Sequence, residues 1–164
     1  MTRETIMKLT VGVSDMQISA NTGDLIVTHA LGSCIGVAIH DATARVGGIL
    51  HFMLPLSQVD PNKAHDNPYM FGDIGIPDFF KETYQAGATK ENLRVVMAGG
   101  AQVFEQQDFF DIGKRNIVIA RKLFWKNNIM IAAENVGGHI PRTLYLEVGT
   151  GKTWFTSHGE TTEL

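Results

Sequence analysis

Short β-rich segments occupy most of the first third of the chain, and they constrain the fold more than any other feature. Residues 7–13 alternate between apolar and polar side chains, as a strand with one buried face does. Residues 25–28, 35–40 and 47–54 are rich in strand-forming side chains, and Pro55 stops the last of them. A short polar stretch at 41–45 predicts that the last two strands form a hairpin.

Two helices are predicted in the middle of the chain. Residues 77–86 form the first, with Pro77 at its first position, and residues 113–127 form the second, capped by Asp111. Residues 56–68 are expected to be an exposed polar loop. Further strands are predicted at 93–98, 129–134, 143–148 and 153–156, the last two joined by a glycine turn. This order predicts an α+β fold, a layered α-β sandwich of mixed β-sheets with packed helices, forming a single domain over residues 1–164.

Composition narrows the class of partner. Apolar residues make up 44% of the chain and charged residues 19%, which is typical of a compact protein with a core. The formal charge of −3 gives no basic footprint, so neither nucleic acid nor an anionic membrane is expected as a partner. The apolar runs are far too short for direct membrane insertion, and no apolar signal core opens the sequence. We therefore expect a cytoplasmic protein with a reduced thiol.

The single cysteine, Cys34, is the first candidate for chemistry. It follows Gly32 and Ser33, and His51 lies one strand downstream, so the predicted hairpin brings thiol and imidazole together. A thiol nucleophile needs either a lowered pKa or an adjacent base, and histidine is the usual base. Thr28, at the end of the preceding strand, could orient the imidazole through its hydroxyl or its carbonyl.

Each of these residues also has a plain structural explanation. Free cysteine is among the most buried residue types, and a core histidine can lie beside it by coincidence, so the spacing alone does not choose between them. Thr28 taken by itself is more simply a strand former.

Three other features are given structural interpretations. His29, His40 and His51 recur at equal spacing but lack the close ligand pairs of a zinc site, so no metal is assigned, and His29 and His40 are expected at the surface or a strand edge. Residues 149–153 resemble part of a phosphate-binding loop but lack its first glycine, which predicts a hairpin turn. Phe104, Phe109 and Phe110 surround an acidic stretch. At least one is expected in the core, and an exposed Phe109 or Phe110 would be a partner-binding anchor.

A set of motifs runs over nearly the whole chain. They are Thr28, Leu31-Gly32-Ser33-Cys34 and Asp41, then His51-Phe52-Met53-Leu54-Pro55, Gly99-Gly100-Ala101, Ile112-Gly113-Lys114-Arg115-Asn116, and Gly137-Gly138 with Arg142. Together they resemble the CheD family, the chemoreceptor glutamine deamidases of bacterial and archaeal chemotaxis. One departure is Asn135, where the family more often carries an acidic residue.

The resemblance implies a cysteine-hydrolase fold like that of a toxin deamidase family, with Cys34 as nucleophile, His51 as general base and acid, and Thr28 as third catalytic member. It implies a protein-glutamine glutaminase that acts on the helical cytoplasmic bundle of chemoreceptors and needs no metal, nucleotide or redox cofactor. It also implies a CheC-type phosphatase of the phosphorylated response regulator CheY as partner. Two alternatives stay open: an adaptor that binds the phosphatase or receptors with catalysis secondary, and another thiol enzyme such as a peptidase or transglutaminase.

Overall fold

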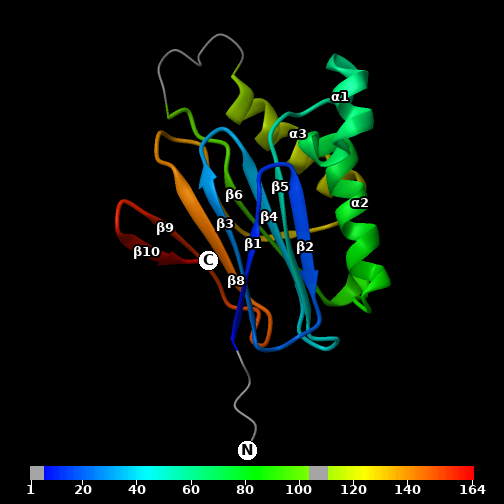
Figure 1. Ribbon diagram of the computed structural model, residues 1–164, viewed down its shortest axis with the longest axis vertical. Coiled ribbons are helices and arrows are strands. Elements are labelled where there is room, and N and C mark those ends of the chain that lie inside the picture. Colours follow the sequence, from blue (N-terminus) through cyan, green and yellow to red (C-terminus); the bar gives the residue numbers. More distant parts are fainter. Residues whose placement is uncertain (1–5, 104–110) are drawn as a thin grey trace, which may run out of the picture.

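Two five-stranded sheets and a layer of helices make up the computed structural model, which describes residues 6–103 and 111–164 (Figure 1). The first sheet has the order β1-β3-β8-β9-β10 and the second the order β2-β5-β4-β6-β7. The strands of the first are β1 (Met7–Val11), β3 (Asp24–Leu31), β8 (Arg142–Glu147), β9 (Thr153–Ser157) and β10 (Glu160–Glu163). Those of the second are β2 (Asp15–Ser19), β5 (Val46–Phe52), β4 (Ile35–Asp41), β6 (Leu93–Gly99) and β7 (Ile131–Val136).

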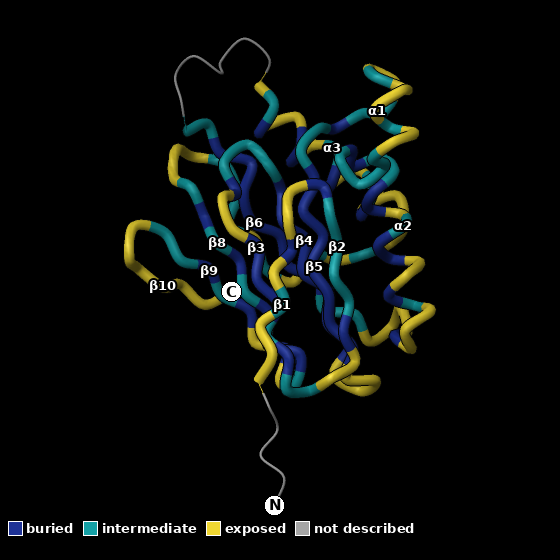
Figure 2. Tube along the Cα trace, viewed as in Figure 1, coloured by how far each residue is buried: buried dark blue, intermediate teal, exposed yellow. Residues whose placement is uncertain are grey.

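The second sheet is the middle layer and is covered on both faces. Along β4, Ile35, Val37 and Ile39 belong to the core shared with the helices, whereas Ala38 belongs to the core shared with the first sheet. This alternation is the period of two that a strand imposes on its side chains. Figure 2 accordingly shows β4, β5 and β6 dark blue along most of their length. The predicted α+β layering is confirmed.

The helices α2 (Gly72–Gln85) and α3 (Ile112–Lys126) cover the outer face of the second sheet. The prediction that Pro77 opens a helix was wrong, because α2 begins five residues earlier and contains Pro77 in its second turn. Tertiary contacts fix that start: Gly72 donates its N–H to the Leu54 carbonyl at 2.8 Å, and a Cβ on Gly72 would lie 2.9 Å from the Phe52 ring. Sequence rules for helix starts do not include such contacts.

The loop predicted at residues 56–68 is exposed in large part but is not irregular. It contains a 3₁₀ turn, Ser57–Val59, and the short helix α1 (Pro61–Asp66), and a further 3₁₀ turn, Pro68–Met70, follows. Asp60 caps α1 by accepting the Lys63 N–H at 3.1 Å. Two strands, β2 and β10, were not predicted. The second has only polar side chains, so it carries no apolar alternation.

The remaining predictions of regular structure are confirmed with shifts of a few residues. The hairpin between β4 and β5 forms with Asp41 paired to Val46, and β8 and β9 form the second predicted hairpin around residues 149–151. Asp111 precedes α3 as predicted, although its side chain makes no capping hydrogen bond. Among the described residues, no helix is both long enough and apolar enough to span a membrane.

Candidate active site

Cys34 lies in the connection between β3 and β4, directly before the first residue of β4. Its carbonyl accepts the N–H of Gly100 at 2.9 Å. This close approach depends on Gly99, which has φ +112°, and a Cβ there would lie only 2.2 Å from the Cys34 carbonyl oxygen. The adjoining Gly32 carbonyl accepts the Ala101 N–H at 2.8 Å. The segment that begins with Gly99 and Gly100 therefore anchors the cysteine backbone.

His51 lies on β5, paired with Gly36 on β4, and its side chain is fully buried. Cys34 precedes Gly36 by two residues, so the thiol and the imidazole project from the same face of the sheet at diagonal positions. That face packs on the first sheet, and Cys34 is a partly buried member of this inter-sheet core. The predicted hairpin thus places both side chains on one face, at the open end of the two strands.

Thr28 contacts the imidazole from the opposite sheet. Its Oγ1 lies 2.7 Å from His51 Nδ1 and donates to the Val11 carbonyl at 2.9 Å. A hydroxyl has one proton, so Thr28 accepts the proton on Nδ1 while its own proton goes to Val11. The neutral imidazole then carries its lone pair on Nε2, the form required of a base.

The Nε2 atom of His51 is buried and has no hydrogen-bond partner among residues 6–103 and 111–164. No hydrogen bond therefore joins it to Cys34 Sγ in the free protein. Catalytic hydrogen bonds are often long in ligand-free enzymes and shorten when substrate binds. The arrangement leaves an unoccupied acceptor on the same sheet face as the only thiol.

Burial keeps both groups uncharged. It raises the pKa of the Cys34 thiol to about 11, although the backbone of Cys34 itself partly offsets the effect. It also lowers the pKa of His51 to about 4. At neutral pH the pair is therefore a thiol and a neutral imidazole rather than a thiolate and an imidazolium. Of the two ways to activate a thiol, a lowered pKa is absent, which leaves proton transfer to an adjacent base.

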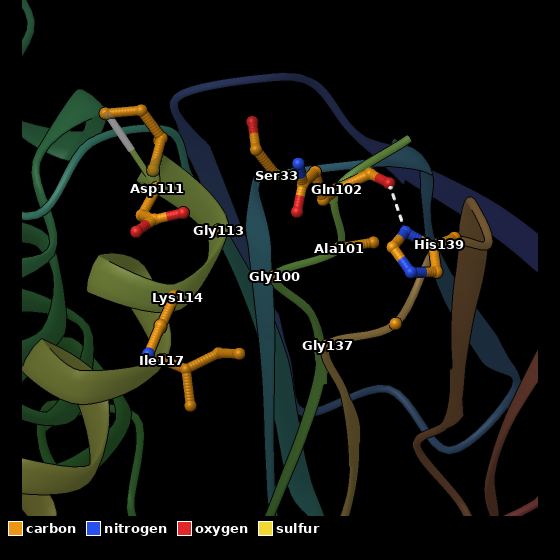
Figure 3. Close-up of a pocket in the computed structure, with 12 residues that line it drawn as sticks. Ser33, Gly100, Ala101, Gln102, Asp111, Gly113, Lys114, Ile117, Gly137 and His139 are labelled. Carbon is orange, nitrogen blue, oxygen red and sulfur yellow. Dashed lines mark hydrogen bonds between the residues drawn. The ribbon is translucent and has the colours of Figure 1, made fainter. Parts of the chain in front are cut away.

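A cavity of about 490 Å³ opens beside the cysteine loop (Figure 3). Ser33 forms part of its wall, and the other walls come from the segment after β6, the first turn of α3 and the loop after β7. His139 lies at one side, with Nδ1 3.0 Å from the Gln102 carbonyl. The side chains of Thr28, Cys34 and His51 do not line the cavity. The cavity adjoins the proposed catalytic residues at Ser33, which directly precedes Cys34 in the chain.

Of the predictions for the other two histidines, the one for His29 is confirmed and the one for His40 is wrong. His29 is exposed, as expected. His40 is buried, with 4% of its surface exposed, and its Nε2 lies 2.7 Å from the Val148 carbonyl. Its polar side chain fits the core because that carbonyl satisfies it. Within the described residues, no group of three histidine, cysteine or acidic side chains is placed to hold a metal. Phe104, Phe109 and Phe110 lie outside the described residues.

Comparisons with known proteins agree with the resemblance. The profile of the family described as CheD chemotactic sensory transduction matches residues 53–157. A probable chemoreceptor glutamine deamidase CheD 1 of Syntrophus aciditrophicus is 50% identical over 149 residues, which cover 91% of this chain and 93% of that protein. A probable chemoreceptor glutamine deamidase CheD of Solibacter usitatus is 44% identical over 96% of this chain and 93% of its own length. One from Pyrococcus abyssi is 37% identical over 93% and 90%.

The chain belongs to the CheD family.

Two further residues of the CheD motifs, Arg142 and Asn116, have structural roles at the end of the fold that holds Cys34 and His51. Neither is one of the three residues predicted for chemistry. Arg142 starts β8 and reaches across to the second sheet, where it donates to Asn135 Oδ1 at 2.8 Å and to the Gly137 carbonyl at 2.9 Å. Burial lowers the pKa of its guanidinium, because the charged form loses contact with water. Asn135 thus accepts from Arg142 without the charge that an acidic residue would add.

Asn116 was named as part of a CheD motif but was given no role. It lies on α3, is fully buried, and donates through Nδ2 to the Ser33 carbonyl at 2.9 Å and the Met53 carbonyl at 2.8 Å. A sequence signal was available, because Asn116 occurs four residues before Ala120 and eight before Phe124, on the buried stripe of the helix. A lone polar residue on such a stripe indicates a buried hydrogen-bonding task.

Proposed function

We propose that this chain is a chemoreceptor glutamine deamidase in which Cys34, His51 and Thr28 carry the reaction. The supporting observation is the hydrogen bond between Thr28 and His51 Nδ1, which leaves Nε2 as the free lone pair of a neutral imidazole. The substrate is proposed from the relatives, which are probable chemoreceptor glutamine deamidases: a glutamine side chain of a chemoreceptor. Strands from both halves of the sequence occur in both sheets, which supports treating residues 1–164 as one catalytic domain.

The first half of the reaction forms a thioester. His51 Nε2 takes the proton of the Cys34 thiol while the sulfur attacks the carboxamide carbon of the glutamine. The carbonyl oxygen becomes an oxyanion, and the proposed donors to it are main-chain N–H groups near Cys34, its own included. The tetrahedral intermediate collapses, the C–N bond breaks, and His51 gives its proton to the departing ammonia.

The second half releases glutamate. A water molecule loses a proton to His51 Nε2 and attacks the thioester carbon, the C–S bond breaks, and the proton returns to the sulfur. Throughout, Thr28 accepts from Nδ1 and stabilises the imidazolium that forms twice per turnover. The substrate gains a carboxylate, and a new negative charge can change the balance between two receptor states.

Partners and location complete the proposal. The chemoreceptor is contacted at its helical cytoplasmic bundle, which places this chain in the cytoplasm. A CheC-type phosphatase of phosphorylated CheY is the proposed protein partner, as the family resemblance implies. Co-purification of a Cys34→Ala chain with such a phosphatase would separate binding from chemistry.

The decisive test is the conversion of receptor glutamine to glutamate, measured by mass spectrometry after incubation with purified protein. We expect Cys34→Ala to abolish conversion, since no other thiol exists in the chain. An uncut receptor would exclude peptidase activity, and glutamate without an amine adduct at the reacted position would exclude cross-linking. Undiminished conversion by folded Cys34→Ala protein would overturn the proposal.

A further inference from the structure

The ladder between β4 and β5 ends before it reaches the cysteine. Its last pair joins Ile35 to Phe52, so Cys34 and Met53 continue beyond the paired region. Cys34 is the proposed nucleophile, and Met53 lies two residues after the proposed base, His51. Past the last pair, no ladder hydrogen bond fixes the separation of the two strands at the point where the chemistry needs it fixed.

The side chain of Asn116 bridges this open end. Its single amide nitrogen donates to the Ser33 carbonyl on the cysteine side and to the Met53 carbonyl on the histidine side. Both protons of the amide are therefore used, one on each strand. The side chain comes from α3, which packs on the opposite face of the sheet from the imidazole, so it holds the backbone without touching the reacting atoms.

The oxygen of the same side chain indicates that stability alone does not explain the residue. Asn116 Oδ1 is buried and has no hydrogen-bond partner in the described part of the chain. A buried acceptor without a partner is unfavourable, and asparagine is a poor helix former. Both disadvantages are present at this position, which points to a use of the two donated bonds beyond holding the helix to the sheet.

We infer that Asn116 is a positioning residue that sets the distance between the Cys34 sulfur and His51 Nε2 by tying the Ser33 carbonyl to the Met53 carbonyl. The inference rests on the proposed function and adds to it a fourth residue outside the reacting groups. Loss of the amide lets the two strand ends separate, and the imidazole then no longer assists the thiol.

The test is a double-mutant cycle read out by alkylation of Cys34 with iodoacetamide near neutral pH, which needs no receptor. In the wild-type background, His51→Ala should slow alkylation about tenfold. In the Asn116→Ala background, the same His51→Ala change should slow it less than about twofold, because the pair is already uncoupled. Asn116→Ala removes both donors. If that variant does not fold, Asn116→Ser, whose hydroxyl can supply only one donor, is used in its place.

Phe124→Leu is the matched control. Phe124 is buried on the same helix, so this variant loosens α3 without touching either carbonyl. It should lower the melting temperature and keep the full effect of His51→Ala. On the receptor, Asn116→Ala should lower kcat with KM unchanged, since the amide does not reach the substrate.

The outcomes separate the two proposals. An equal effect of His51→Ala in the Asn116→Ala and wild-type backgrounds overturns the positioning role and leaves the proposed catalytic pair standing. No effect of His51→Ala in wild-type protein overturns the pair, and with it the role of Asn116, because nothing would then be positioned.

Discussion

The two ends of the β4–β5 hairpin each hold a buried histidine opposite a glycine, yet the two histidines are arranged for different tasks. Near the turn, His40 pairs with Gly47 and its Nε2 is satisfied by the Val148 carbonyl at 2.7 Å. At the open end, His51 pairs with Gly36, is held through Nδ1 by Thr28, and leaves Nε2 without a partner. Burial is common to both. The unsatisfied nitrogen distinguishes the proposed base, His51, from a histidine with a structural task.

The largest contrast should come from replacing each histidine by glutamine. We expect His51→Gln to lower kcat for receptor deamidation by about a thousandfold, since it removes the general base and acid. His40→Gln should leave kcat within about threefold and instead lower the free energy of unfolding by about 1–3 kcal/mol, because it disturbs a buried hydrogen bond. Deamidation rates and urea unfolding measure the two effects. Equal losses of kcat would remove the distinction between the two ends.

Thr28 should give the next largest effect. Thr28→Val keeps the shape of the side chain but removes the acceptor for Nδ1, so the imidazole is no longer held in the form with its lone pair on Nε2. We expect kcat to fall by about tenfold to a hundredfold, less than for His51→Gln. Thr28→Ser restores the hydroxyl and should recover most of the rate. A Thr28→Ser chain as slow as Thr28→Val would show that the methyl group, not the hydroxyl, matters.

The free imidazole should also be visible in the pH dependence of stability. Because burial lowers the pKa of His51 to about 4, the unfolded chain binds a proton between that pH and the ordinary value of 6.5 while the folded chain does not. Stability from this group is therefore complete above the ordinary value and is lost as the pH falls toward 4. Between about pH 7 and pH 4.5 the loss should amount to about 2 kcal/mol.

The measurement is urea unfolding of wild type and His51→Gln at both pH values. The carboxylates titrate in both proteins, so the difference between the two proteins isolates His51. A difference that does not change with pH would mean that the imidazole is protonated as easily in the folded chain as in the unfolded one.

The smallest effects on stability and rate are expected from replacing Gly36 or Gly47 by alanine. A Cβ on Gly36 would lie 3.0 Å from Leu31, 3.1 Å from Leu144 and 3.4 Å from the Thr28 methyl group. A Cβ on Gly47 would lie 3.0 Å from Leu146 and 3.4 Å from the His40 ring. Both Gly→Ala changes should cost about 1 kcal/mol of unfolding free energy. Only Gly36→Ala should slow deamidation, by severalfold, because only it crowds Thr28. Equal rates for the two variants would contradict this.

Local patterns predicted most of the strands and the pairing of β4 with β5, since strand formers and turn residues act over a few positions. The same patterns placed Cys34 and His51 on one hairpin. They failed where distant contacts decide the outcome. His40 was expected at the surface or a strand edge, because the Val148 carbonyl that contacts its Nε2 lies far away in the sequence. The start of α2 depends on Phe52 and Leu54, which a capping rule does not consider.

The site shows the same division. The sequence predicted that the hairpin brings Cys34 and His51 together, whereas the Val11 carbonyl, which accepts the Thr28 proton, comes from a strand on the opposite sheet. No sequence pattern relates Val11 to His51, because their relation depends on how β1 pairs with β3. The two carbonyls that accept from Asn116 could not be predicted from the sequence either, because every residue has the same backbone oxygen.

The parallel pairing of β1 with β3 has a consequence for how the chain matures during its synthesis. The carbonyl that takes the Thr28 proton lies on β1, and β3 sits between β1 and β8, a strand that is translated well after both. A growing chain already contains its thiol and its imidazole long before β8 is available to complete the sheet. We expect nascent chains that end before Arg142 to be inert toward receptor glutamines, because β3 then lacks one of its two neighbouring strands.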